Sequence, residues 1–260
     1  MATNYLEDMF SLKGKTAIMT GATGGLGSSM ALALAKAGAS IVSIELPEDP
    51  NAANIAKAIS DAGSTLQAFY CDIGNAEKLR ACFAQIWDAG IVPDILVNSA
   101  GIARRNKCED ATDAELDLLL DINVKSFYIS CQEFGRRLLS LDRPGKIINI
   151  ASVTAFQANQ NTSIYSASKG AVVQMTKAFS NEWSSRGIQV NAICPGWMRT
   201  PMTEVYVADE AVSSYLMSRI PMGRWGDATE LNAAALFLAA PGNSFTTGAS
   251  VVVDGGFCAK

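Results

Sequence analysis

Three side chains in the second half of the chain have the types and spacing needed to move a proton to or from an alcohol. Tyr165 and Lys169 stand four residues apart, which places them on one face of a helix. A free tyrosine titrates near about pH 10, and a nearby ammonium would stabilise its phenolate. Ser152 stands at the end of a predicted strand, where it could hydrogen-bond a substrate oxygen on which charge develops. A Tyr and a Lys four residues apart often occur by chance, so the prediction of a catalytic site depends on Ser152 as well.

The whole chain contains no histidine. This excludes Ser-His-Asp and Cys-His nucleophile arrangements and every metal site that uses imidazole. The acid–base group of an enzyme with this sequence must therefore be Tyr, Lys, Asp, Glu or Cys. The six cysteines form no C-x-x-C pair, so we predict free thiols, a reducing cytoplasmic location and no metal site.

A glycine-rich turn at residues 20–27 (TGATGGLG) lies between a predicted strand and a predicted helix. Glycines there let the backbone approach a pyrophosphate closely, and the helix N-terminus offers free N–H groups to that anion. A purely structural turn is the alternative. The turn residues that we predict to bind a dinucleotide are Gly21, Thr23, Gly25, Leu26 and Gly27.

Glu45 closes the second predicted strand and indicates which dinucleotide is bound. An acidic group there can accept hydrogen bonds from the ribose 2′-OH of NAD and would repel the 2′-phosphate of NADP. The turn contains no Arg or Lys that would bind that phosphate. We therefore predict NAD, with NADP less favoured; an ordinary solvated glutamate at a strand end is the alternative.

Apolar runs of strand length alternate with helical patterns, which indicates an α/β fold with a parallel sheet covered on both faces. The predicted strands are 15–20, 40–45, 65–71, 94–97, 146–151, 188–193 and 249–253. The predicted helices are 25–37, 51–62, 75–89, 112–139 (one long helix with a bend near Asn123), 165–186 and 228–239. Residues 195–224 are predicted to be irregular.

Composition limits the classes of partner. The chain has 260 residues and no visible linker or repeat, so we expect a single domain over 1–260. A net charge of −4 without a basic run argues against nucleic acid. No apolar run is long enough for a membrane span, and the first ten residues lack a secretory signal. The expected partner is a small-molecule substrate.

A series of ordered segments resembles the short-chain dehydrogenase/reductase family along nearly the whole chain. These segments are T-G-A-T-G-G-L-G at 20–27, Cys71-Asp72-Ile73, Asn98-Ser99-Ala100-Gly101, Asn123, Ser152, Tyr165 with Lys169, N-A-I-C-P-G-W-M-R-T at 191–200, and Asp254-Gly255-Gly256. The resemblance implies a Rossmann-type doubly wound parallel sheet of seven strands in three layers, ordered 3-2-1-4-5-6-7. It also implies NAD(P) binding and a homotetramer.

The resemblance also implies roles for individual residues. Its catalytic residues are Asn123, which anchors a water in the proton relay, Ser152, Tyr165, which exchanges the proton, and Lys169, which also holds the nicotinamide ribose. Tyr165 is also a cofactor-binding position. Further cofactor-binding positions are Asp72 and Ile73 along the adenine, Asn98, Ala100 and Gly101, and Pro195, Met198 and Thr200 at the nicotinamide carboxamide. The family usually has Asn at the position of Ser99, where it braces the central sheet, so that brace is in doubt here.

Within the family, three segments look like those of 2-deoxy-gluconate 3-dehydrogenases or 3-keto sugar-acid dehydrogenases: GIARR at 101–105, NEW at 181–183 and IPMGRWG at 220–226. Arg104 and Arg105 could then clamp a substrate carboxylate, because a planar guanidinium matches its shape. A pair of solvated arginines is the alternative. We interpret residues 196–224 as a substrate lid, with a packed surface subdomain as the alternative.

Together these observations predict an oxidoreductase that transfers a hydride between NAD(H) and a secondary alcohol or ketone, in a sugar acid or polyol. Two alternatives stay open. One is an NADPH-dependent ketoreductase of an acyl or secondary-metabolite ketone, against which Glu45 argues. The other is a non-catalytic dinucleotide sensor, which would have no need of Tyr165 or Lys169.

Overall fold

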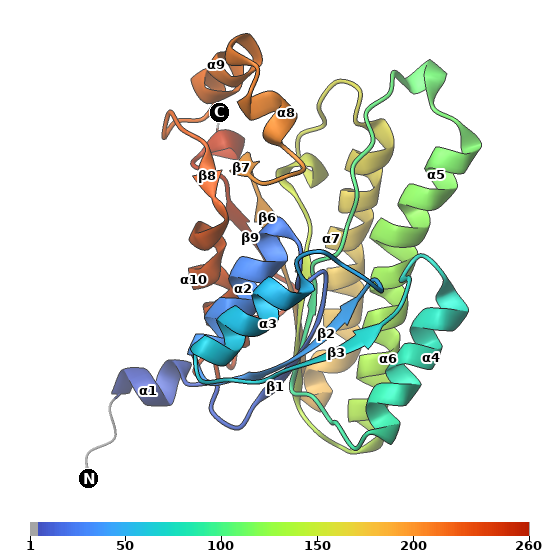
Figure 1. Cartoon of the computed structure of the whole chain (residues 1–260), viewed down its shortest axis with the longest axis vertical. Coiled ribbons are helices and arrows are strands. Elements are labelled where there is room, and N and C mark those ends of the chain that lie inside the picture. Colours follow the sequence, from blue (N-terminus) through green and yellow to red (C-terminus); the bar gives the residue numbers. More distant parts are fainter. Residues whose placement is uncertain (1–4, 260) are drawn as a thin grey trace.

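The computed structural model describes residues 5–259, and a seven-stranded parallel sheet forms its centre (Figure 1). The strands run in the order β3-β2-β1-β4-β5-β6-β9, which confirms the predicted order. Their bounds are β1 (Thr16–Thr20), β2 (Ser40–Glu45), β3 (Leu66–Tyr70), β4 (Ile95–Asn98), β5 (Gly145–Ile150), β6 (Ile188–Pro195) and β9 (Ser250–Val253). These runs are almost continuously apolar because helices cover both faces of the sheet.

Two groups of helices cover the two faces, giving three layers (Figure 1). One face carries α2 (Gly25–Lys36), α3 (Ala52–Asp61) and α10 (Asn232–Ala239). The other carries α4 (Ala76–Asp88), α6 (Ser126–Ser140) and α7 (Ser163–Trp183). A short helix, α1 (Tyr5–Phe10), precedes β1. No helix within residues 5–259 is both long enough and apolar enough to cross a membrane.

The long helix predicted over 112–139, with a bend near Asn123, is confirmed. The chain forms α5 (Asp113–Leu120), then one π-helical turn at Asp121–Lys125, and continues without a break into α6. Thr112 and Glu115 form a capping box that fixes the start of α5. The π turn lies at the predicted bend and contains Asn123, whose side chain is fully buried. Such turns are frequent at functional sites.

The region predicted to be irregular contains regular structure, so that expectation was wrong. It holds α8 (Glu204–Val207) and α9 (Glu210–Arg219), and β7 (Met198–Arg199) pairs with β8 (Gly226–Asp227). The sequence pattern did not show these elements because they are short and carry little helical amphipathicity.

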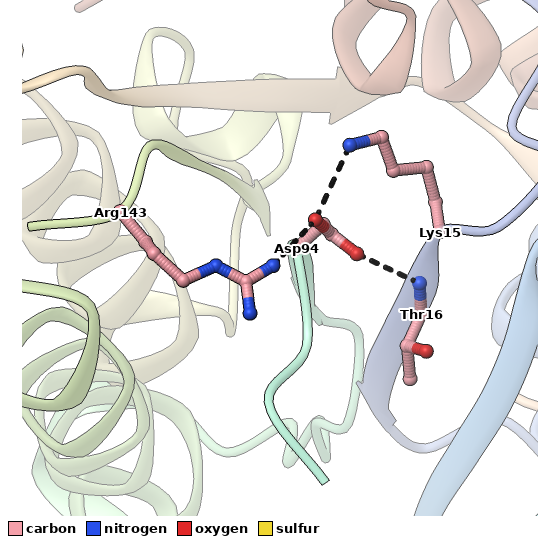
Figure 2. A network of polar contacts seen from close by, with 4 residues as sticks. All are labelled: Lys15, Thr16, Asp94 and Arg143. Atoms are coloured by element: carbon pink, nitrogen blue, oxygen red, sulfur yellow. Dashed lines mark hydrogen bonds and ion pairs between the residues drawn. The ribbon is translucent and has the colours of Figure 1, made fainter. Parts of the chain in front are cut away.

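Polar side chains connect neighbouring strands at both the amino and the carboxyl ends of the strands. At the amino ends, Asp94 accepts a hydrogen bond from the Thr16 backbone N–H (3.0 Å) and pairs with Lys15 (3.3 Å) and Arg143 (3.2 Å), as Figure 2 shows. Asp94 thereby connects the starts of β1, β4 and β5.

The brace left in doubt at Ser99 is supplied by its neighbour Asn98. The Asn98 amide donates to Asn149 Oδ1 (2.8 Å), which joins β4 to β5. The Asn149 amide in turn donates to the Thr176 hydroxyl on α7 (3.0 Å). Asn98 therefore holds the central strands in register at their carboxyl ends.

Candidate active site

Two pockets open beside each other where the central strands end. One, of about 460 Å³, runs along the glycine-rich turn and is called the groove below. The other, of about 480 Å³, begins at Ser152 and Tyr165 and is called the substrate pocket below. Gly101, Ile102 and Met202 line both. A ligand that fills the groove would therefore reach the substrate pocket at its end.

The groove collects most of the residues predicted to bind a dinucleotide. They are Gly21, Thr23, Gly25, Leu26, Gly27, Glu45, Asp72, Ile73, Ala100, Gly101 and Thr200. They come from the ends of β1, β2, β3 and β4 and from the segment after β6. The parallel arrangement brings these separate ends together, which is why ligands bind at such an edge.

The turn has the shape that a pyrophosphate requires. A Cβ on Gly27 would lie 1.9 Å from the Gly21 carbonyl oxygen, and one on Gly21 would lie 2.7 Å from the Ala100 backbone. No side chain caps the N-terminus of α2, and its first turn contains no acidic residue. Backbone N–H groups and the positive end of the helix dipole are thus available for an anion. The residues present fit a bound dinucleotide.

Glu45 lies at the bottom of the groove and is only 5% exposed. Its Oε2 accepts a hydrogen bond from the Ser43 hydroxyl at 3.0 Å. Burial raises the pKa of this carboxyl, the Ser43 bond opposes the rise, and the charge of Asp49 adds to it. The side chain is therefore held in place rather than solvated at a strand end.

Five residues predicted to bind the cofactor do not line the groove. Two of them, Tyr165 and Lys169, are described below with the substrate pocket. Asn98 points its amide into the sheet as described above. Pro195 is buried, and Met198 is buried in the core, where its sulfur occupies the space beside Gly226. Met198 borders a separate cavity of about 210 Å³.

Ser152 and Tyr165 meet at the inner end of the substrate pocket. Ser152 follows β5 and caps a short 3₁₀ turn, so its Oγ accepts the backbone N–H of Thr154 (3.2 Å). Tyr165 lies in the first turn of α7, and its phenol shares a hydrogen bond with Ser152. Two hydroxyls, one from a strand end and one from a helix, thus converge on one point.

Lys169 and Asn123 lie directly behind this point. The ammonium of Lys169 donates to the Ile150 carbonyl (2.9 Å) and lies 5.7 Å from the Tyr165 ring centroid. A Cβ on Gly101 would be 3.6 Å from Lys169 Nζ and 3.3 Å from Asn123 Oδ1, so both groups approach the junction of the two pockets.

Asn123 also positions the loop that follows β4. Its Oδ1 accepts the backbone N–H of Ile102 (2.9 Å), and its Nδ2 donates to the Ile102 carbonyl (2.8 Å). The same Nδ2 lies 3.2 Å from the Ser168 hydroxyl on α7. The π turn therefore connects the loop after β4 with the helix that carries Tyr165.

The electrostatics differ from the expectation that Lys169 would lower the pKa of Tyr165. Burial raises the pKa of the Tyr165 phenol; the Ser152 hydrogen bond and the positive charge of Arg105 act against that rise. Burial also lowers the pKa of Lys169 to about 8. Lys169 donates its hydrogen bond to the Ile150 carbonyl and not to the phenol. The cation that opposes the rise in the pKa of Tyr165 is therefore Arg105.

Arg105 forms the outer wall of the substrate pocket. Its guanidinium carbon lies 3.7 Å from the Tyr206 ring centroid and 5.7 Å from that of Trp197. Arg104 also lines the pocket, but its guanidinium donates to the carbonyl of its own neighbour, Ala103. The structure therefore distinguishes two arginines that the sequence treated alike.

Sequence reasoning missed several residues that line the two pockets. In the groove these include Leu46, Asp49, Asn51 and Ile122. In the substrate pocket they are Val153, Thr154, Asn159 and Thr162. One signal was present for the second set, because Thr154 to Thr162 connect Ser152 with Tyr165 and cannot run far from either. The other lining residues, Trp197, Pro201, Met202, Thr203 and Tyr206, belong to the segment 196–224 that the sequence analysis interprets as a substrate lid.

Comparison with known proteins adds to this geometry. A family model described as enoyl-(acyl carrier protein) reductase matches residues 21–258. The 2-dehydro-3-deoxy-D-gluconate 5-dehydrogenase of Bacillus subtilis is 39% identical over 256 residues, covering 98% of this chain and 99% of the relative.

Solved structures resemble this chain over nearly its full length. A gluconate 5-dehydrogenase from Burkholderia cenocepacia, in complex with NADP and tartrate, is 35% identical, with a TM-score of 0.93 over 98% of this chain and 100% of that one. A protein from Agrobacterium tumefaciens with bound NADP, provisionally described as a 2-deoxy-D-gluconate 3-dehydrogenase, is 38% identical. Its TM-score is 0.90 over 96% of this chain and 99% of that one.

Proposed function

Because this chain belongs to the short-chain dehydrogenase/reductase family, we propose that it interconverts a secondary alcohol of a sugar acid or polyol and the corresponding ketone, with NAD as cofactor. The family resemblance found in the motifs is thereby confirmed. One observation carries the proposal: a pocket of about 480 Å³ has Ser152 and Tyr165 at its inner end and Arg105 in its outer wall. This pocket can hold a polar molecule with a reacting carbon at one end and an anionic group at the other.

In this proposal Tyr165 is the acid–base group. Its phenolate removes the proton of the substrate hydroxyl during oxidation, and the phenol returns it during reduction. Ser152 hydrogen-bonds the same substrate oxygen, where negative charge develops as the proton leaves. Bound nicotinamide would supply the hydride acceptor or donor for the carbon that carries this oxygen.

Lys169 and Asn123 act around Tyr165. Lys169 lies at the junction of the pockets, where its ammonium can bind the ribose next to the nicotinamide. Asn123 holds the loop after β4 through Ile102 and, following the family resemblance, anchors a water that passes the proton onward.

Arg105 is the proposed partner of a substrate carboxylate. A guanidinium binds a planar carboxylate through two parallel hydrogen bonds. A relative bound tartrate, a hydroxylated dicarboxylate, and relatives include enzymes of gluconate derivatives. Arg104 is a weaker candidate, since its guanidinium is hydrogen-bonded to its own loop.

NAD is proposed over NADP because Glu45 is buried in the groove, where its carboxylate would bind a ribose 2′-OH and repel a 2′-phosphate. Three related structures contain NADP, so an NADP-dependent reaction, including the alternative ketoreductase, is the competing outcome. We further propose that residues 196–224 cover the substrate, since Trp197, Met202, Thr203 and Tyr206 line its pocket. A single domain, a homotetramer and a cytoplasmic location stay predictions.

The test is an assay of purified protein with NAD+ and with NADP+ against gluconate-type sugar acids, uncharged polyols such as galactitol, and hydrophobic secondary alcohols. We expect the highest kcat/KM with a sugar acid and NAD+. Activity on hydrophobic alcohols alone would contradict the substrate class, whereas equal kcat/KM with NADP+ would contradict only the choice of cofactor.

A further inference from the structure

The loop between β2 and α3 brings a second carboxylate into the groove beside Glu45. Asp49 lines the groove together with Leu46 and Asn51. The preceding residue, Glu48, has a left-handed backbone with φ of 61°. A non-glycine residue rarely adopts this conformation, and here it turns the chain back toward the glycine-rich turn.

Hydrogen bonds hold the Asp49 side chain in one orientation. Its Oδ2 accepts the hydroxyl proton of Thr23 at 2.8 Å, and its Oδ1 accepts the backbone N–H of Asn51 at 2.9 Å. Both oxygens of the carboxylate are thus used as hydrogen-bond acceptors. Thr23 belongs to the glycine-rich turn and stands 26 residues earlier in the chain.

The bond also changes what Thr23 can offer a ligand. A threonine hydroxyl has one proton to donate. Since that proton is directed to Asp49, the hydroxyl presents only lone pairs to the groove, and it cannot donate to a phosphate oxygen without first leaving Asp49.

The groove therefore has acidic but no basic side chains on its described walls near Glu45 and Asp49, where we expect the adenosine of a dinucleotide to bind. Glu45 and Asp49 interact closely enough that the charge of Asp49 helps to raise the pKa of Glu45. The described residues that line the groove include no lysine or arginine. A monoester phosphate carries a charge of about −1.5 to −2 at pH 7, and nothing on these walls compensates it.

We propose that Asp49, held in place by Thr23 and Asn51, is a second specificity-determining residue that excludes a ribose 2′-phosphate from the groove. This inference rests on the NAD preference proposed above and adds a residue to it. Glu45, at the end of β2, binds the ribose 2′-OH and repels a 2′-phosphate. Asp49 also repels the 2′-phosphate. In addition, Asp49 accepts the Thr23 hydroxyl proton, so that Thr23 cannot donate it to the phosphate.

The experiment measures binding rather than turnover. Calorimetric titration of the purified protein with 5′-AMP and with 2′,5′-ADP isolates the contribution of the 2′-phosphate. The variants are Asp49→Asn and Asp49→Ser, which remove the charge but keep an oxygen that can accept from Thr23. Glu48→Gln is the matched control, because it removes one exposed negative charge from the adjacent position and does not line the groove.

We expect the native protein to bind 5′-AMP more tightly than 2′,5′-ADP. Asp49→Asn and Asp49→Ser should each lower the ratio of the Kd for 2′,5′-ADP to the Kd for 5′-AMP by about tenfold, through tighter binding of 2′,5′-ADP. The repulsion between like charges a few ångströms apart changes a binding constant by about that factor. Glu48→Gln should leave the ratio unchanged. High salt screens the repulsion, so it should lower this ratio of Kd values more in the native protein than in the Asp49 variants.

Three results would overturn the inference. An unchanged ratio in both Asp49 variants, with discrimination in the native protein, refutes the role of Asp49 and leaves the NAD preference standing. Equal weakening of both nucleotides assigns Asp49 a structural role in the loop only. Equal binding of both nucleotides by the native protein refutes the NAD preference itself.

Discussion

The guanidinium of Arg105 lies over the ring of Tyr206, with its central carbon 3.7 Å from the ring centroid. Arg105 follows β4, and Tyr206 belongs to α8, about a hundred residues later in the chain. The contact joins α8, which helps to line the substrate pocket, to the loop that Asn123 holds. It also leaves the arginine charge close enough to act on the pKa of Tyr165.

Replacing Arg105 by Met should raise KM for a sugar acid by about 10- to 100-fold, since a charged hydrogen bond contributes about 1.5–3 kcal/mol. An uncharged polyol should lose far less. Arg104→Met is the matched control, because it removes the same charge from an exposed neighbour in the same pocket wall. Steady-state kinetics on both substrates measure the effect, and an equal loss on the polyol would contradict carboxylate binding.

The same substitution should shift the pH dependence of alcohol oxidation. Oxidation needs the phenolate, so kcat/KM rises as pH rises through the pKa of Tyr165. The Arg105 cation lowers that pKa, so its removal should move the rise to higher pH, whereas Arg105→Lys should shift it less. A profile that stays in place would show that Arg105 does not act on the phenol.

Tyr165→Phe should lower kcat by about 10²- to 10⁴-fold, the usual contribution of a positioned acid–base group. Dinucleotide binding should persist, because Tyr165 lines the substrate pocket and not the groove. Quenching of tryptophan fluorescence can report that binding. Unchanged turnover would remove the proposed mechanism, and a native protein that binds dinucleotide without any turnover would favour the sensor alternative.

The Lys169 ammonium should lose its proton at about pH 8 in the protein without ligand, because burial disfavours its charged form and so lowers its pKa. NMR of isotope-labelled lysine side chains should therefore show signals that titrate well below the usual lysine range. Lys146 has a similarly lowered pKa of about 8, at the opposite end of β5. Lys169→Met and Lys146→Met should each remove a different one of these signals, and a spectrum in which every lysine titrates near about pH 10 would contradict the burial argument.

Gly27→Ala should weaken dinucleotide binding by more than tenfold, because the new Cβ would lie 1.9 Å from the Gly21 carbonyl oxygen and force the turn apart. Gly24→Ala is the control within the same turn, since its Cβ would lie 3.4 Å from that oxygen. Calorimetric titration with NAD+ compares the two variants. Equal loss in both would mean that the turn tolerates no side chain for reasons other than this contact.

The spatial order of the strands was implied by the family resemblance. The positions of the strands along the chain, the glycine-rich turn, Glu45 at a strand end and the Tyr165–Lys169 spacing could be read from the sequence itself. Each of these depends on residues close together in the chain. Apolar runs specify buried strands, glycine specifies a tight turn, and a spacing of four specifies one helix face. The sequence by itself therefore determined the fold and the outline of the chemistry.

Only the tertiary structure decided which distant residues meet. The Thr23–Asp49, Arg105–Tyr206 and Asn98–Asn149 contacts join segments from different elements, and the π turn at Asn123 follows from packing rather than from helix propensity. Local propensity and periodicity carry no information about such pairs, because their energy appears only when the chain is folded. The selection of cofactor, the orientation of the arginine and the pKa of the phenol all depend on those pairs, since burial and neighbouring charge exist only in the folded protein.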